Sequence, residues 1–293
     1  MLTVPFPRSG VLTFRDLSLP YGRRTLIMGI INVTPDSFSG DGLGRSVDRA
    51  VGLARRMVDE GADLLDVGGE STRPGAQPIP EVEEIHRVVP AIRAIVAAVR
   101  VPVAVDTRKA AVARAALEAG AHLVNDVDGL QRDPEMAPVI ASFGAAAIVM
   151  HSPGPAWQVP WPATYGDIVA EVRSFLDASI QLGIRAGILC ERIIVDPGFG
   201  FGKSVADNLT ILRRLGDFRS LGQPIMIGTS RKSTIGRLLN ADVADRLEGS
   251  LATLPLAIAE GVDIVRVHDV LASARVVRVA DAIVRQNLDD GAI

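Results

Sequence analysis

Hydrogen-bonding and charged side chains recur along this chain, each placed directly after a short apolar run. The acceptors and amides in such places are Asp66, Asp106, Asn125 and Asp196. The donors and cations in such places or in the loops that follow them are Thr72, Arg73, Lys232, Arg266 and His268. A carboxylate can accept two parallel hydrogen bonds from a planar heterocycle, and guanidinium or ammonium groups suit an anion such as a phosphate. The two groups together predict a site for a polar heterocycle that bears a phosphate-type group.

A divalent metal could connect that anionic group to the protein. Asn32 and Asp66 carry oxygen atoms of the kind that Mg²⁺ prefers, and both follow apolar runs. The four histidines do not show the HExxH spacing of a zinc site. Cys190 is the only cysteine, which excludes a disulfide framework within the chain and a cysteine-based metal site. We expect Cys190 to be a buried small apolar residue.

Eight apolar runs precede these polar residues and are typical of parallel strands that are covered on both faces. The runs are Leu26–Asn32, Asp63–Asp66, Val101–Asp106, His122–Asp126, Ala146–His151, Arg192–Asp196, Pro224–Thr229 and Asp263–His268. Amphipathic segments lie between them and predict helices. These segments are Ser46–Glu60, Glu81–Val99, Lys109–Ala119, Pro134–Phe143, Asp167–Ala186, Val205–Leu215, a longer region from Lys232 to Glu260, and Val270–Gln286. Gly61, Gly120 and Gly261 stand in near-identical steps where glycine would end a helix in a left-handed conformation.

This alternation predicts an α/β fold, a (β/α)8 TIM barrel, over a single domain of residues 1–293. Residues 1–24 form an N-terminal extension in which Val11–Phe14 and Leu17–Leu19 are expected to pair as a β-hairpin. A doubly wound open sheet is the main alternative, and it usually has fewer strands. Active sites of such barrels lie at the carboxyl ends of the strands, where the polar residues are expected to meet.

Three loops stand out at that end of the predicted barrel. The loop of residues 33–42 is long and rich in Gly, Ser and Asp, which favours a lid over the substrate. In Leu64–Gly75 an apolar run ends at Asp66, and two glycines and an anion-binding Ser-Thr-Arg sequence follow. Gly198–Ser204 is similar to a phosphate-binding P-loop but has Pro197 where that motif needs its first glycine. We interpret it as a flexible active-site loop with Phe199 and Phe201 exposed near the rim.

Composition excludes several classes of function. The formal net charge is −3, with 31 basic and 34 acidic residues, so there is no general basic field for a nucleic acid. No apolar run reaches the roughly 18 residues of a membrane-spanning helix. The N-terminus lacks a basic region followed by an apolar one, as a signal peptide would have. We expect a soluble, cytoplasmic protein that acts on small molecules.

At these motifs the sequence resembles the dihydropteroate synthase family of pterin-binding enzymes. The matching segments are Met28–Ser39, Asp66–Gly75, Val105–Thr107, Asn125–Asp126, Asp196–Lys203, Gly228–Ser233 and Arg266–Asp269. Each motif is moderately specific, and together they cover about residues 26 to 280 in register. The resemblance implies a transferase that joins 6-hydroxymethyl-7,8-dihydropterin diphosphate to p-aminobenzoate in folate biosynthesis. It also implies Mg²⁺, a homodimer and a target for sulfonamides.

The resemblance also implies roles for individual residues. The implied pterin-binding residues are Asp106, Asn125, Asp196 and Lys232, with Asp66 and Met150 beside them. The diphosphate falls to Thr72, Arg73, Arg266 and His268, and Asn32 is the Mg²⁺-linked position. The p-aminobenzoate pocket falls to Thr72, Pro74, Phe38, Phe201, Lys232 and Ser233. Because the arylamine is neutral at pH 7, the reaction needs no strong general base, and departure of the diphosphate can run ahead of attack at the pterin CH2.

Two segments depart from the usual family pattern, and two other functions compete with synthase activity. Gly40-Asp41 displaces the acidic residue of the first loop by one position, and Ser152-Pro153 replaces the usual Met-Arg after His151. A pterin-binding relative without synthase activity is one alternative, and a methyltetrahydrofolate-type methyltransferase is another. The methyltransferase has no need for Arg73, Pro74 or the Ser-Arg-Lys-Ser sequence of residues 230–233.

Overall fold

Eight parallel strands form the centre of the computed structural model, which describes residues 9–33, 43–71, 77–154 and 162–286. The strands are β3 (Leu26–Asn32), β4 (Leu64–Gly68), β5 (Val103–Asp106), β6 (Leu123–Asp126), β7 (Ala146–Met150), β8 (Ile193–Asp196), β9 (Met226–Ile227) and β10 (Ile264–Val267). They lie side by side in chain order, and β10 returns to pair with β3 so that Ile264 is opposite Leu26. A parallel bridge between Val195 and Ile225 joins β8 to β9. The strands therefore form the nearly closed barrel that the sequence predicted.

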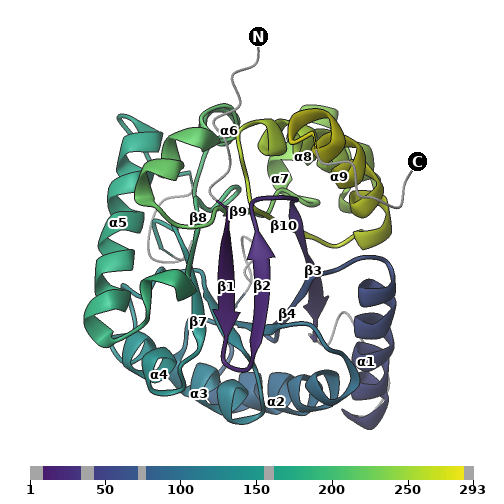
Figure 1. The fold of residues 1–293 in the computed structure, drawn as a ribbon, viewed down its shortest axis with the longest axis vertical. Coiled ribbons are helices and arrows are strands. Elements are labelled where there is room, and N and C mark those ends of the chain that lie inside the picture. Colours follow the sequence, from purple (N-terminus) through teal and green to yellow (C-terminus); the bar gives the residue numbers. More distant parts are fainter. Residues whose placement is uncertain (1–8, 34–42, 72–76, 155–161, 287–293) are drawn as a thin grey trace.

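Helices follow the strands along the chain and surround the barrel (Figure 1). They are α1 (Leu43–Asp59), α2 (Glu81–Ala98), α3 (Ala110–Glu118), α4 (Met136–Ser142), α5 (Ile168–Ala186), α6 (Val205–Arg213), α7 (Ser233–Leu239), α8 (Leu247–Ala259) and α9 (Val270–Val284). Gly61, Gly120 and Gly261 have φ values of 106°, 108° and 83°, which glycine adopts at little cost. The helix ends predicted at these glycines are confirmed. Within the part of the chain that the structure describes, no helix is both long enough and apolar enough to cross a membrane.

The region after Lys232, which the sequence presented as one long helical segment, divides into two helices. Helix α7 ends at Leu239, the next residue Asn240 has a φ of 51°, and a 3-10 turn (Val243–Asp245) leads to α8. Strand β9 is also shorter than predicted. Pro224 has no N–H for the ladder, and its carbonyl accepts a hydrogen bond from the N–H of Val195 at 3.0 Å. The segment still completes the barrel.

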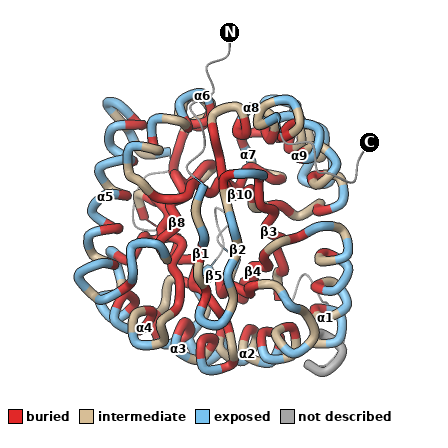
Figure 2. Tube along the Cα trace, in the orientation of Figure 1, coloured by how far each residue is buried: buried red, intermediate tan, exposed pale blue. Residues whose placement is uncertain are grey.

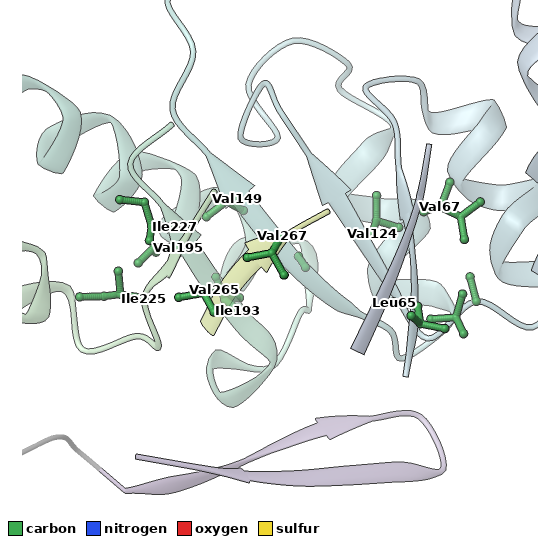
Figure 3. Packing of buried hydrophobic residues seen from close by; sticks show 14 of the residues in the cluster. Leu65, Val67, Val124, Val149, Ile193, Val195, Ile225, Ile227, Val265 and Val267 are labelled. Atoms are coloured by element: carbon green, nitrogen blue, oxygen red, sulfur yellow. The ribbon is translucent and has the colours of Figure 1, made fainter. Parts of the chain in front are cut away.

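Side chains alternate between the outside and the inside of the barrel along each strand. Outward residues such as Leu65 and Val124 belong to the large apolar cluster that the helices cover (Figure 3). Their neighbours Leu64 and Leu123 belong to a second, smaller cluster in the lumen. Figure 2 shows the barrel strands as buried and the outer faces of the helices as exposed. The barrel is therefore covered on both faces, as the continuous apolar runs predicted.

An N-terminal hairpin closes one end of the lumen. Strands β1 (Gly10–Phe14) and β2 (Leu17–Tyr21) pair antiparallel, with Phe14 opposite Leu17. The side chains of Leu12 and Phe14 are fully buried and belong to the lumen cluster. In Figure 1 the hairpin lies in front of the strands, inside the ring of helices. The predicted hairpin is confirmed, and the other end of the barrel is left for the polar residues.

Cys190 is exposed, and the expectation that it is buried was wrong. It begins a 3-10 turn, Cys190–Arg192, that leads into β8. The preceding Leu189 is also exposed. An isolated apolar residue in a surface turn carries no periodic pattern, so the preference of cysteine for burial was a poor guide there.

Candidate active site

The polar residues at the strand ends face into the same end of the barrel. On six of the strands the residue at this end stands two positions beyond a residue of the lumen cluster, and a step of two keeps the side chain on the inward face. Five of these six residues are polar, and the sixth is Met150. The steps are Leu64 to Asp66, Ala104 to Asp106, Leu123 to Asn125, Ile148 to Met150, Ile194 to Asp196 and Ile264 to Arg266. The lumen therefore has an apolar layer against the hairpin and a polar layer at the carboxyl ends of the strands, where barrel enzymes bind substrates.

A single guanidinium connects the carboxylates of this polar layer. Nε of Arg266 lies 2.6 Å from Oδ2 of Asp66, and its Nη2 lies 2.7 Å from Oδ2 of Asp106. The amide nitrogen of Asn125 donates to the same oxygen of Asp66 at 3.0 Å. Strands β4, β5, β6 and β10 thus each contribute one member to a continuous network.

Burial sets the protonation behaviour of this network. Burial raises the pKa of Asp106 to about 7, although the Arg266 cation opposes the shift, and the Asp66 carboxylate raises it further. Burial alone would lower the pKa of Arg266, but Asp66 and Asp106 hold it above its ordinary value. Arg266 therefore remains a cation, while Asp106 can gain or lose a proton near neutral pH.

Two buried oxygen atoms of the network have no hydrogen-bond partner among the described residues. They are Oδ1 of Asp66 and Oδ1 of Asn125. A buried polar atom without a partner is costly, so these two atoms indicate a ligand that donates hydrogen bonds. A heterocycle with ring N–H or amino groups fits that need.

Asp196, on strand β8, adds a further acceptor to the polar layer of the lumen. It is the last residue of β8, it is buried, and its Oδ1 accepts a hydrogen bond from the N–H of Gly198 at 2.7 Å. Burial raises the pKa of Asp196, while this hydrogen bond and the cations Lys232, Arg266 and Lys203 oppose the shift.

Lys232 and Phe201 form one wall at the rim. Nζ of Lys232 lies 4.0 Å from the centre of the Phe201 ring, which is a cation–π contact. Phe201 also packs with Met150 and Val127 in a small apolar cluster. Lys232 immediately precedes α7, and Ser233 is the first, exposed residue of that helix. The wall combines a flat apolar surface with a cation.

His268 stands next to this network as a neutral ring. Burial lowers its pKa to about 3, and the cations Arg266, Arg231 and Lys232 act in the same direction. Its Nδ1 lies 3.0 Å from Oγ of Ser230, and that oxygen also accepts the backbone N–H of His268. In the tautomer with its proton on Nε2, Nδ1 of His268 accepts the Ser230 hydroxyl proton, and Nε2–H is a donor. His268 can therefore donate to an anion without carrying a charge.

Several predicted site residues lie outside the described residues, so their positions stay predictions. They are Phe38 in the loop of residues 33–42, and Thr72, Arg73 and Pro74. The described residues on the two sides of positions 72–76 are connected by hydrogen bonds. Oε2 of Glu70 accepts the N–H of Ile79, and Nζ of Lys109 donates to Glu70, to the carbonyl of Ile79 and to Glu84.

The expected exposure of two phenylalanines in the loop between β8 and α6 was wrong. Phe199 is 1% exposed and belongs to the large apolar cluster, and Phe201 is 8% exposed. Nor does the segment of residues 198–204 resemble a phosphate cradle, because the side chain of Lys203 turns inward and is buried. An apolar residue in a glycine-rich loop carries no periodicity, so its burial depends on how the loop folds back.

Sequence reasoning did not assign roles to Lys203 and Lys109. A signal was present, because only three of the 31 basic residues are lysines, and they are Lys109, Lys203 and Lys232. Each follows the carboxyl end of a barrel strand. A chain that uses arginine almost everywhere keeps lysine where a compact ammonium with three donors is needed.

Comparison with known proteins agrees with this geometry. The pterin binding enzyme family matches residues 28–268. The dihydropteroate synthase of Synechocystis sp. (strain ATCC 27184 / PCC 6803 / Kazusa) is 45% identical over 266 residues, which are 90% of this chain and 92% of that protein. The structure of Xanthomonas albilineans dihydropteroate synthase with 4-aminobenzoic acid has a TM-score of 0.88 and 42% identity, and the match covers 96% of this chain and 99% of that chain. The same enzyme in complex with 7,8-dihydropteroate has a TM-score of 0.84 and 40% identity, covering 95% and 100%. The chain belongs to the dihydropteroate synthase family of pterin-binding enzymes, which are transferases.

Proposed function

We propose that this chain joins 6-hydroxymethyl-7,8-dihydropterin diphosphate to p-aminobenzoate and releases diphosphate and 7,8-dihydropteroate. The C–O bond to the diphosphate breaks, and the arylamine nitrogen forms a C–N bond to the pterin CH2 and loses one N–H proton, which passes to the diphosphate or to water. The observation that carries the proposal is the buried network of Arg266, Asp66, Asp106 and Asn125, with two acceptor oxygens left for a ligand. The relatives bound to 4-aminobenzoic acid and to 7,8-dihydropteroate support the same substrates.

The acceptors of the lumen bind the pterin ring. Asp196 and Asp106 accept from ring N–H and amino groups, and the two unpartnered oxygens of Asp66 and Asn125 supply further acceptors. The apolar cluster that contains Met150 provides a flat surface beside them. The ring is thereby oriented with its CH2 group toward the rim.

Arg266 and the neutral ring of His268 stabilise the departing diphosphate, together with Arg73 by family resemblance. Preorganised donors in a buried site stabilise a developing negative charge more strongly than water does, because they need no reorganisation when the charge develops. An electron-rich pterin ring stabilises positive charge at the CH2 carbon, so C–O cleavage runs ahead of attack. The arylamine is neutral at pH 7, and no general base is needed to activate it.

Mg²⁺ is part of the proposal, with Asn32 as its protein ligand. Asn32 ends β3 at the rim, and its side chain has no hydrogen bond to any described residue. An amide oxygen suits Mg²⁺, which commonly binds through one or two protein oxygens and substrate phosphates. When bound, the ion would neutralise charge on the diphosphate. Chelation with EDTA should lower turnover, and Asn32→Ala should raise the Mg²⁺ concentration needed for half-maximal rate; an unchanged Mg²⁺ dependence would refute the role of Asn32.

The rim wall of Lys232 and Phe201 binds the arylamine. The cation attracts the p-aminobenzoate carboxylate, and the Phe201 ring packs against an aromatic substrate. By resemblance, Thr72, Pro74, Phe38 and Ser233 complete this pocket. A closed rim would exclude the water that could otherwise capture the cationic pterin.

The decisive test supplies the purified protein with both substrates and Mg²⁺ and measures pteroate by chromatography. Formation of 7,8-dihydropteroate with equal release of diphosphate is expected. Pterin binding without pteroate would instead support a non-catalytic pterin-binding protein. A sulfonamide should inhibit competitively with p-aminobenzoate.

We further infer a cytoplasmic homodimer. The exposed apolar residues Leu256 on α8 and Val279 and Ile283 on α9 support self-association through these helices, which lie next to each other in Figure 1. The exposed free thiol of Cys190 suits a reducing compartment. Sedimentation should give a dimer, and Ile283→Glu should shift it toward a monomer; a wild-type monomer at micromolar concentration would refute the dimer. Recovery of the native protein outside the cytoplasmic fraction of its cells would refute the location.

A further inference from the structure

Lys203 is a buried cation in the loop between β8 and α6, and none of the substrate roles above uses it. Its side chain keeps 7% of its exposed surface. Its Nζ lies 2.8 Å from the carbonyl oxygen of Gly198 and 3.1 Å from that of Phe201, and it lies 2.9 Å from Nδ1 and 3.3 Å from the carbonyl oxygen of His151. The first two belong to its own loop, and His151 follows β7 directly. Nζ therefore joins the loop to the adjacent strand end.

These contacts call for the charged form of the lysine. An ammonium has three N–H donors for these four acceptors, whereas a neutral amine has two and would leave more of the acceptors without a donor. Burial lowers the pKa of Lys203 to about 7, and the carboxylate of Asp196 acts in the opposite direction. Because Nδ1 of His151 accepts, its ring proton belongs on Nε2. Burial and the Lys203 cation lower the pKa of His151, so that its ring stays neutral.

The loop around this ammonium has a shape that requires glycine. Gly198, Gly200 and Gly202 have φ values of 71°, 86° and 58°. A Cβ atom at Gly198 would lie 1.9 Å from the carbonyl oxygen of His151, so the loop passes directly against the end of β7. The positive φ values turn the carbonyls of Gly198 and Phe201 toward the same point, which Nζ of Lys203 occupies.

The shaped loop reaches the pterin site at two places. The N–H of Gly198 donates to the carboxylate of Asp196, and the ring of Phe201 lies 4.0 Å from Nζ of Lys232. On the outer side, Oδ1 of Asn208 accepts the N–H of Gly200 at 2.7 Å. The direction of the Asp196 carboxylate and the position of the Phe201 ring both depend on the loop conformation that the Lys203 ammonium stabilises.

We propose that Lys203 is a positioning residue of the pterin site, whose ammonium gathers the carbonyls of Gly198 and Phe201 against His151 and so orients Asp196 and Phe201. The proposal rests on the proposed function, because it concerns how the same site is held. Lys203 itself does not touch the substrate. It fixes the Gly198 N–H that donates to Asp196, and it fixes the position of the Phe201 ring. Its positive charge also favours the ionised form of the Asp196 carboxylate.

The first test compares Lys203→Met, which keeps the stem and removes the charge, with the wild type. The KM for the pterin diphosphate should rise at least ~10-fold while kcat falls less than ~3-fold, because orientation of the bound ring is what is lost. Arg213→Met is the matched control, since it removes an exposed cation from the adjoining helix α6, and it should leave both constants unchanged. A pterin KM within ~2-fold of the wild type in Lys203→Met overturns the proposal.

The pH profile separates positioning from a merely structural role. The charged groups that act on Asp196 are Lys203, Lys232 and Arg266, and His151 beside Lys203 is neutral. Removing one of the cations makes the ionised carboxylate less favourable, so the acid limb of kcat/KM for the pterin should move to higher pH in Lys203→Met. An unmoved acid limb in a folded Lys203→Met variant contradicts the proposal.

Chemical rescue provides a second and independent readout. Lys203→Ala leaves a space lined by these four acceptors, and added methylammonium should restore at least ~5-fold of the lost pterin affinity. Lys203→Met fills that space with an apolar stem and should not respond. Titration calorimetry with the pterin diphosphate measures these affinities even if pteroate formation fails, so that failure of the synthase activity and failure of the positioning role remain distinguishable. A folded Lys203→Ala variant without rescue, judged by its thermal melt, counts against the proposal.

Discussion

Nε of Arg266 lies 2.6 Å from Oδ2 of Asp66, and two residues that are 200 positions apart in sequence share one ion pair. The same guanidinium also reaches Asp106. Both carboxylates are held in the lumen by strands β4 and β5, so the direction of the guanidinium is set by the barrel itself. A donor that is oriented in this way needs no rearrangement when an anion develops at the rim.

Loss of that guanidinium should reduce turnover strongly. Arg266→Ala should lower kcat by about 10²–10³-fold, the range found when one preorganised donor to a developing anion is removed. Arg266→Lys should recover little, because an ammonium cannot bridge two carboxylates as the planar fork does. Steady-state kinetics with the pterin diphosphate measure both.

Stability must be controlled in that experiment, since Asp66 and Asp106 lose their partner. Breaking a buried ion pair costs about 3–5 kcal/mol of unfolding free energy. Arg266→Met combined with Asp66→Asn removes part of that cost, so it should unfold later in urea than Arg266→Ala while turnover stays low. Near-normal turnover in Arg266→Ala would show that the guanidinium does not serve the diphosphate.

The contact between Lys232 and Phe201 should appear as a coupling energy. Phe201→Leu keeps an apolar wall but removes the ring below Nζ, and the lost cation–π interaction is worth about 0.5–2 kcal/mol. The KM for p-aminobenzoate should rise accordingly, and a double-mutant cycle with Lys232→Met should show a coupling of the same size. Additive effects of the two changes would mean that the ring does not act through Lys232.

Gly198 should tolerate no side chain. A Cβ atom would meet the carbonyl oxygen of His151 at 1.9 Å, and the φ of 71° is strained for any other residue. Gly198→Ala should therefore displace the loop, with at least ~10-fold weaker binding of the pterin diphosphate in calorimetry. Gly52→Ala is the matched control in helix α1, where nothing lies within 4 Å of the added atom, and it should raise the unfolding free energy by about 0.5–1 kcal/mol. Equal pterin affinity in the two variants would exclude the tight packing of the loop.

Pterin binding should weaken as the pH falls through neutrality. Burial raises the pKa of Asp106 to about 7 and raises that of Asp196 as well. In the proposed function their ionised forms accept the pterin N–H groups, so the contribution of each carboxylate to binding is present above its pKa and is lost as it gains a proton. His268 contributes nothing to this range, because its pKa is about 3. Calorimetry between pH 5.5 and 8.5 is the measurement, and Asp106→Asn should remove part of the dependence; a flat profile in the wild type would contradict it.

Much of the architecture could be predicted because its signals are local. Apolar runs, amphipathic segments and the glycines at 61, 120 and 261 are visible within a few residues of sequence, and the barrel, the hairpin and the family that they and the motifs predicted are confirmed. The gathering of the polar residues followed from topology alone, since parallel strands bring their carboxyl ends to one edge. Phe199 was predicted to be exposed and is buried, whereas Cys190 was predicted to be buried and is exposed. Both predictions were wrong because neither residue lies in a periodic segment.

The sequence by itself determined which strands carry polar residues, how far each stands beyond the apolar layer, and the family to which the motifs belong. The tertiary structure decided the partners. The pairing of Arg266 with Asp66 depends on the return of β10 to β3, and the four acceptors around Lys203 depend on a loop that folds back on the end of β7. Alternation along a strand is a property of neighbouring residues, whereas an ion pair or a buried ammonium requires groups that only barrel closure and loop packing bring within hydrogen-bonding distance of each other.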